Sequence, residues 1–106
     1  MSLQTTGFYH HVYFYLTDAP NAAANIAVGC RKHLSGIPGV LRLELGKTAG
    51  TNRPVVDNDY GLALLVEFEN AAAHDVYQDH PDHHTFIAEC KANWTHVKVY
   101  DSVPFA

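Results

Sequence analysis

The order in which two kinds of periodicity alternate along this chain constrains its fold more than any single residue does. Side chains of alternating polarity predict strands, because successive strand residues point to opposite faces. Apolar residues three or four positions apart predict helices. The strand patterns cover 8–16, 40–47 and 96–101, and the helical patterns cover about 22–35, 70–79 and 82–93. Residues 60–69 form a further strand, whose near-continuous apolar run indicates that both of its faces are covered.

This order is βαββαβ, with the second helix in two pieces. It predicts an α+β, ferredoxin-like fold, in which one antiparallel four-stranded sheet carries helices on one face only. The first strand is apolar or aromatic on both faces, so we expect a second copy of the chain to cover the open face of the sheet and form a homodimer. One face of that strand carries His10, Val12, Phe14 and Leu16, and the other carries Tyr9, His11, Tyr13 and Tyr15.

Length and composition limit the function classes. The chain has 106 residues, which predicts a single domain over 1–106, and its formal net charge is −4 without any basic run. Nucleic-acid binding is therefore not expected. Neither a membrane-spanning run nor a signal-peptide pattern is visible, which favours a cytoplasmic protein. Cys30 and Cys90 lie in apolar stretches and are expected to be buried free thiols. The polar stretch 46–59 predicts a long connection, either a lid over a pocket or a simple hairpin loop.

A short segment rich in histidine interrupts the second helix. His80 precedes Pro81, and a residue before proline avoids the helical region, so the helix should end or bend there. A new helical turn can begin at Pro81, where the missing N–H costs nothing. The bend can turn the Tyr77 hydroxyl and the His83 ring towards one another.

Two interpretations of this segment remain open. In the first, a neutral His83 removes a proton next to a carbonyl group, and Tyr77 orients the ring or donates to the enolate oxygen. In the second, Tyr77, His80 and His83 only lock the bend through hydrogen bonds. Phe86 and Trp94 are expected in the core or in a pocket wall.

Metal binding is not expected from this segment. His80, His83 and His84 offer the right ligand types, but adjacent helical side chains such as His83 and His84 diverge by about 100° and rarely share an ion. His33 and His74 lie on helix faces that we expect to be exposed and solvated.

Several local motifs resemble those of the stress-responsive dimeric α/β-barrel family, often called Dabb. The resemblance covers roughly residues 9–103 and is most specific in the tyrosine–histidine–proline–histidine spacing. Its pieces are His10 in the first strand, Ile37-Pro38-Gly39-Val40, Val66-Glu67-Phe68-Glu69, Tyr77-x-x-His80-Pro81-x-His83, Phe86, and Val99-x-Asp101.

The resemblance implies a homodimer in which two sheets form a barrel, and an apolar pocket between the sheet and the helices of each subunit. A plant polyketide-cyclase branch of the family catalyses an aldol condensation without a cofactor. By motif, the tyrosine and histidine that carry its chemistry correspond to Tyr77 and His83. The first-strand histidine in its pocket corresponds to His10, with His11 as the rival. We prefer His10 because it shares a face with the apolar residues that should point at the helices.

The expected function is therefore a cofactor-free cyclase, lyase or isomerase acting on a carbonyl compound, with His83 as the base, Tyr77 as its partner and His10 as an auxiliary. The alternative is a non-catalytic, stress-associated homodimer or a module that binds a small apolar ligand. One departure from the cyclase branch concerns the pocket walls, because the first helix carries small residues where large ones would be needed. These are Ala22, Ala23, Ala24 and Ala27.

Overall fold

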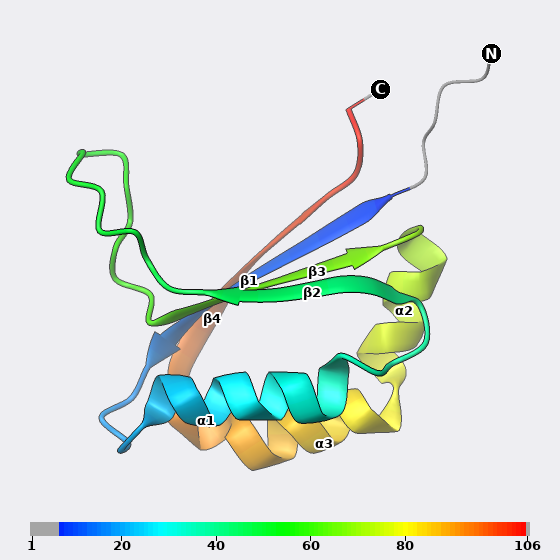
Figure 1. Cartoon of the computed structure of the whole chain (residues 1–106), viewed down its shortest axis with the longest axis horizontal. Coiled ribbons are helices and arrows are strands. Elements are labelled where there is room, and N and C mark those ends of the chain that lie inside the picture. The colour runs from blue at the N-terminus through cyan, green and yellow to red at the C-terminus, as the bar shows by residue number, and fades with distance from the viewer. Residues whose placement is uncertain (1–6, 106) are drawn as a thin grey trace.

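The computed structural model describes residues 7–105 and contains one four-stranded antiparallel sheet with helices on one side (Figure 1). The predicted α+β, ferredoxin-like fold is confirmed. Along the chain the elements are β1 (Phe8–Leu16), α1 (Ala22–Gly29), the π-helical turn η1 (Cys30–Leu34), β2 (Val40–Gly46), β3 (Leu62–Phe68), α2 (Ala71–Asp79), α3 (Pro81–Cys90), the 3-10 turn η2 (Lys91–Asn93) and β4 (Trp94–Ser102).

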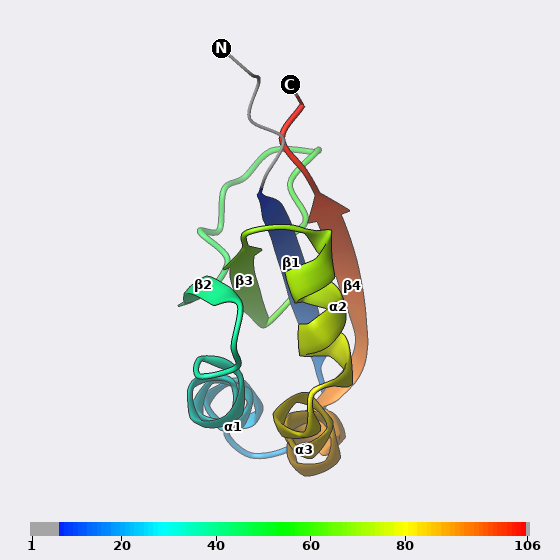
Figure 2. The same cartoon turned by 90° about the vertical axis from the view of Figure 1, so that its right-hand side faces the viewer.

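The strands lie in the order β2-β3-β1-β4, so the first and last strands are neighbours. In this register His10 of β1 lies between Val66 of β3 and Asp101 of β4. Strand alternation then sends Val12 and Phe14 to the helix side, where both are buried. Figure 2 shows all three α-helices on that side, with α2 in front of the sheet and α1 and α3 below it.

The hydrophobic core lies between the sheet and the helices. Cys30 and Cys90 are buried free thiols, as expected, and burial raises the pKa of Cys30 to about 12. The core consists of Val12, Phe14, Ile26, Cys30, Leu34, Ile37, Leu62, Leu64, Val66, Phe68, Tyr77, Phe86 and Cys90.

Local capping explains where the second helix begins and where it breaks. The Asn70 side chain accepts a hydrogen bond from the backbone N–H of Ala73 at 2.9 Å, which caps α2. His80 is extended, with φ −65° and ψ 139°, and its Nδ1 accepts from the N–H of Asp82 at 3.0 Å. The predicted bend at Pro81 is therefore present, and one histidine caps the helix that follows it.

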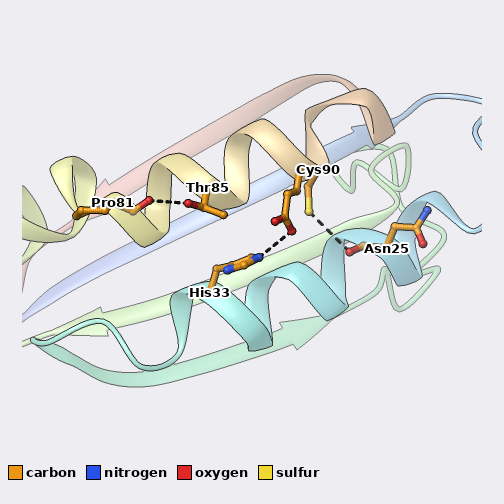
Figure 3. Close-up of polar contacts among 6 residues, drawn as sticks. Asn25, His33, Pro81, Thr85 and Cys90 are labelled. Atoms are coloured by element: carbon orange, nitrogen blue, oxygen red, sulfur yellow. Dashed lines mark hydrogen bonds and ion pairs between the residues drawn. The ribbon is translucent and has the colours of Figure 1, made fainter.

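The helix α1 and the turn η1 that continues it pack beside α3, and polar contacts cross between them (Figure 3). The Cys90 thiol lies 3.8 Å from the backbone carbonyl of Asn25. His33 Nε2 lies 2.8 Å from a carboxylate oxygen of Glu89, and only 12% of the His33 side chain is exposed. The expectation of a solvated His33 is wrong, because α3 lies close enough to pair with it.

The long connection between β2 and β3 is tied to the open face of the sheet. The Tyr15 hydroxyl donates to Asp57 Oδ2 at 2.6 Å. The hollow beneath this contact has a volume of about 500 Å³, and it lies on the side away from the helices. Its lining residues are His11, Tyr13, Tyr15, Asp57, Tyr60, Tyr100 and Ser102.

Within residues 7–105, no helix has both the length and the hydropathy needed to cross a bilayer.

Candidate active site

A second cavity, of about 440 Å³, lies on the helix side of the sheet and is the candidate active site. The strands β1 and β4 form its floor, and α2, α3 and the end of η1 form its walls. Most of its surface is apolar, but six polar side chains face it. These are His10, His74, Tyr77, Gln78, His83 and Asp101.

His10 and Asp101 form the tightest polar contact in this pocket. His10 is 5% exposed, and its Nδ1 lies 2.6 Å from Asp101 Oδ1, while about a third of the Asp101 side chain is exposed. The neighbouring positions of β1 and β4 bring the two residues together although 91 positions separate them in the chain. The contact fixes the ring through Nδ1, and Nε2 makes no hydrogen bond to any residue in 7–105. His11 instead lines the hollow on the open face.

Tyr77 and His83 meet across the bend between α2 and α3. Their ring centroids are 4.9 Å apart and the ring planes are inclined by 70°, so the contact is edge-to-face. No hydrogen bond joins the Tyr77 hydroxyl to the His83 ring. The tyrosine is 1% exposed, and burial raises its pKa far above the usual value, so the hydroxyl keeps its proton.

The electrostatic surroundings of His83 favour its neutral form. Burial lowers the pKa of His83, and the nearby rings of His10, His84 and His74 lower it further when they are charged. A neutral imidazole can accept a proton, so His83 meets one requirement of a general base.

His74 also faces the pocket, which contradicts the expectation that it is solvated. Its ring lies 4.8 Å from the His10 ring and stacks on Phe8 at 4.3 Å, and its Nε2 is 2.9 Å from the Gln78 side-chain nitrogen. Burial lowers the pKa of His74. The signal that could have found it is its position three residues before Tyr77, since residues three apart share a helix face.

His80 and Pro81 lie outside this pocket, on a separate surface hollow, so their place in the motif is at the bend. Phe86 and Trp94 lie in the pocket wall with their ring centroids 5.8 Å apart. No residue of α1 lines the pocket, so the alanines of that helix do not determine its size. The connection 46–59 contributes no residue either, so it is not a lid over this cavity.

Solved structures with the same fold come from several organisms. A Dabb family protein with a ferredoxin-like fold from Mesorhizobium loti is 28% identical, with a TM-score of 0.78, and the match covers 95% of this chain and 99% of that one. A dimeric ferredoxin-like protein of unknown function from Thermobifida fusca is 20% identical, with a TM-score of 0.77 and coverage of 98% and 96%. A hydroxynitrile lyase from Passiflora edulis is 13% identical, with a TM-score of 0.78 and coverage of 92% and 93%.

No curated protein matches this sequence. The family profile described as the stress responsive A/B barrel domain, Dabb, matches residues 8–104. That match spans nearly the whole chain and both halves of the pocket, from His10 to Asp101. The chain therefore belongs to the stress responsive A/B barrel domain family.

Proposed function

We propose that this protein is a cofactor-free enzyme that acts on a small carbonyl compound by acid–base chemistry, as a cyclase, isomerase or lyase. The observation that carries the proposal is the contact of 2.6 Å between His10 and Asp101 at the floor of the pocket. A carboxylate bonded to one imidazole nitrogen orients the ring and stabilises the imidazolium that forms when the other nitrogen takes a proton.

In this mechanism His10 is the general base. Its Nε2 removes a proton from the carbon next to the carbonyl group, and Asp101 stabilises the resulting positive charge. The sequence assigned the base role to His83 and an auxiliary role to His10. Because Asp101 bonds to His10 and no carboxylate bonds to His83 within residues 7–105, the geometry favours exchanging the two roles.

Tyr77 is suited to stabilise the enolate oxygen. Its raised pKa keeps the hydroxyl protonated, and the hydroxyl makes no hydrogen bond within the described part of the chain that would compete with a ligand. A donor aimed at a developing negative charge in a dry site commonly contributes about 10²–10³ in rate. The His10 imidazolium would return the proton to the product, and His83 would hold the Tyr77 ring by its edge-to-face contact.

The pocket walls suggest the class of substrate. Phe14, Phe86 and Trp94 pack together around the cavity, with Phe14 and Trp94 rings 5.0 Å apart. The volume of about 440 Å³ falls within the usual range of about 300–1,000 Å³ for small-molecule sites. A small, largely apolar ketone or an aromatic carbonyl compound fits these walls.

Proton abstraction can be tested without knowing the natural substrate. The protein is incubated in D₂O with a panel of enolisable aromatic ketones and one cyanohydrin, since the Passiflora edulis neighbour is a hydroxynitrile lyase. Deuterium incorporation or cleavage is followed by NMR. We expect the wild-type protein to accelerate at least one reaction, and His10→Gln to lower that rate by about 10² or more.

The matched control is His11→Gln, which changes the adjacent residue on the opposite face of the sheet and should retain the rate. Two results contradict the enzyme proposal: no acceleration of any compound by the wild-type protein, or equal rates for His10→Gln and wild type.

A second candidate function is a non-catalytic module that binds a small apolar ligand and acts in a stress response. The observation that favours it is the near-complete burial of Tyr77, at 1% exposure, which leaves little of that side chain for a substrate to reach. Saturable binding of an aromatic ketone without turnover, lost in Trp94→Ala, would support this function over the enzyme.

We further infer that the protein works as a homodimer that pairs through the open sheet face. That face carries Tyr13 and Tyr100, whose rings are 6.0 Å apart, and 60% of Tyr100 is exposed in the single chain. The test is light scattering of Tyr100→Lys, which should dissociate the dimer. The control is Val76→Lys, a similarly exposed position on α2 (55%) that should leave the dimer intact. A monomeric wild-type protein at micromolar concentration contradicts the inference.

A further inference from the structure

We propose that His10, His74 and Asp101 form a binding site for one divalent transition-metal ion, best suited to Zn²⁺, whose open coordination position faces the pocket. Each of the three residues offers one ligand atom, and these atoms lie within 4.8 Å of one another. The inference does not depend on the proposed acid–base function, because metal binding is measurable with the metal alone.

The three ligands come from three different elements that converge at one end of the pocket. His10 lies on β1, Asp101 on the neighbouring strand β4, and His74 on α2, which crosses above them. Two imidazole nitrogens and one carboxylate oxygen are a ligand set that Zn²⁺ uses at sites with an open position for water or substrate. At bond lengths of about 2.1 Å, a tetrahedral ion holds its ligand atoms about 3.4 Å apart. The His10–Asp101 contact of 2.6 Å would open towards this distance when an ion replaces the shared proton, and the wider separations, up to 4.8 Å, would close.

The surroundings of His74 hold its ring in place for such a role. The ring stacks on Phe8 with centroids 4.3 Å apart and planes inclined by 20°, and its Nε2 contacts the Gln78 amide at 2.9 Å. With the ion on Nδ1, Nε2 carries the ring proton, and the Gln78 amide would turn its oxygen to accept from it, which is the outer contact that orients metal-binding histidines. The His10 ring is held by its place inside the sheet.

The site differs from the one that histidine clustering in the sequence would suggest. The rings of His83 and His84 are 6.3 Å apart and perpendicular, and His80 lies at the bend, outside the pocket. The candidate site instead combines a buried strand residue, a strand residue about 90 positions away, and the helical His74.

Metal binding at this site would have a direct effect on acid–base chemistry in the pocket. An ion held by His10 Nδ1 and Asp101 replaces the proton that these two residues share. The ring then carries its proton on Nε2, which can no longer act as the base. Zn²⁺ would then inhibit the activity proposed above, whereas the absence of that activity would leave the binding measurement unaffected.

The experiment is a calorimetric titration of ZnCl₂ into the untagged protein at pH 7.5, with three variants. His74→Phe keeps a ring to stack on Phe8 but removes one ligand, and Asp101→Asn keeps the shape of the carboxylate but removes its charge. His84→Phe is the matched control, since His84 is an exposed histidine on α3 outside the pocket. We expect one ion per chain, a loss of affinity of 10-fold or more in the first two variants, and no change in the control.

A second measurement uses Co²⁺, whose visible absorption reports tetrahedral coordination. The wild-type spectrum should show the intense bands of a tetrahedral site, and His74→Phe should lose them while its urea midpoint remains close to that of wild type. The inference is overturned if the wild-type protein binds no ion, or if His74→Phe and Asp101→Asn bind as tightly as wild type. The latter result would assign the metal to surface histidines.

Discussion

Replacing Tyr77 by phenylalanine separates the structural contribution of this residue from its functional one. The tyrosine ring packs edge-on against the Phe68 ring at 4.9 Å and against the His83 ring at 4.9 Å, with the His10 ring 5.8 Å away. All of these contacts involve the ring, which phenylalanine keeps. The hydroxyl makes no hydrogen bond to any residue between 7 and 105, so its removal should leave no buried partner without a bond.

The magnitudes follow from this geometry. A hydrogen bond with a protein partner typically contributes about 1 kcal/mol to the free energy of unfolding, and a partner left buried and unbonded costs about 1–3 kcal/mol. Neither loss applies to Tyr77→Phe, so we expect its free energy of unfolding to stay within about 0.5 kcal/mol of wild type. Tyr77→Ala removes a large side chain that is 1% exposed and should cost about 3–5 kcal/mol.

Urea denaturation distinguishes these outcomes. With a slope of about 1–3 kcal/mol per molar urea, a change of 0.5 kcal/mol moves the midpoint by only about 0.2–0.5 M. In the deuterium-exchange assay, loss of the hydroxyl donor should lower the rate by about 10²–10³. A loss of more than about 1.5 kcal/mol in Tyr77→Phe at constant slope would show that the hydroxyl bonds to a protein partner. Full activity in Tyr77→Phe would refute its role as a donor to the enolate.

Three further predictions concern stability. Asn70→Ala removes the cap of α2 and should lower the free energy of unfolding by about 1 kcal/mol, measured in urea, whereas Asn70→Asp should retain most of it. Phe86→Ala opens a cavity at a residue that is 2% exposed and should cost about 3–5 kcal/mol by calorimetry. Burial lowers the pKa of His74 and of His83, so between the lowered pKa and the ordinary value of about 6.5 the unfolded chain binds more protons than the folded one. Their contribution to stability is therefore fully present above about pH 6.5 and is lost as the pH falls below it. The urea midpoint of the double variant His74→Gln, His83→Gln should fall less between pH 7.5 and pH 5 than the wild-type midpoint. An equal fall of the midpoint in the two proteins would contradict this prediction.

Local sequence patterns predicted the order of the strands and helices because most of these elements have a regular period. The bend before Pro81 was predictable for the same reason, since a proline restricts only its own and the preceding residue. Boundaries were less predictable: β4 begins at Trp94 rather than at His96, because an irregularity in the pairing between Tyr15 and Leu16 lets the strand extend to Trp94. Residue type alone is also a poor guide to capping, because Asn21 before α1 adopts a left-handed conformation and makes no capping bond with its side chain.

The contents of the pocket were predictable only in part, because they depend on contacts between distant segments. Tyr77 and His83 follow from a local motif, but the pairing of His10 with Asp101 requires the register of two strands that lie 91 positions apart in the chain. No short-range pattern contains that register. His11 remained a rival of His10 for a similar reason. Strand alternation places the two residues on opposite faces, but alternation alone does not say which face meets the helices.

His74 was missed because the usual rule for helices fails in α2. The rule expects apolar residues on the face that meets the sheet, yet α2 presents His74, Tyr77 and Gln78 to the pocket at positions i, i+3 and i+4. Such a polar inner face is stable only if its groups find partners or solvent, and here the pocket is lined by the edge strand β4, whose Val97 and Val99 remain 37% and 46% exposed. A polar stripe at helical spacing, next to an edge strand, is therefore evidence of a cavity rather than of a solvated helix face. Sequence rules based on apolar burial fail at this place because α2 faces a cavity rather than a close-packed core, and such failures are expected at functional sites, which is what we propose this cavity to be.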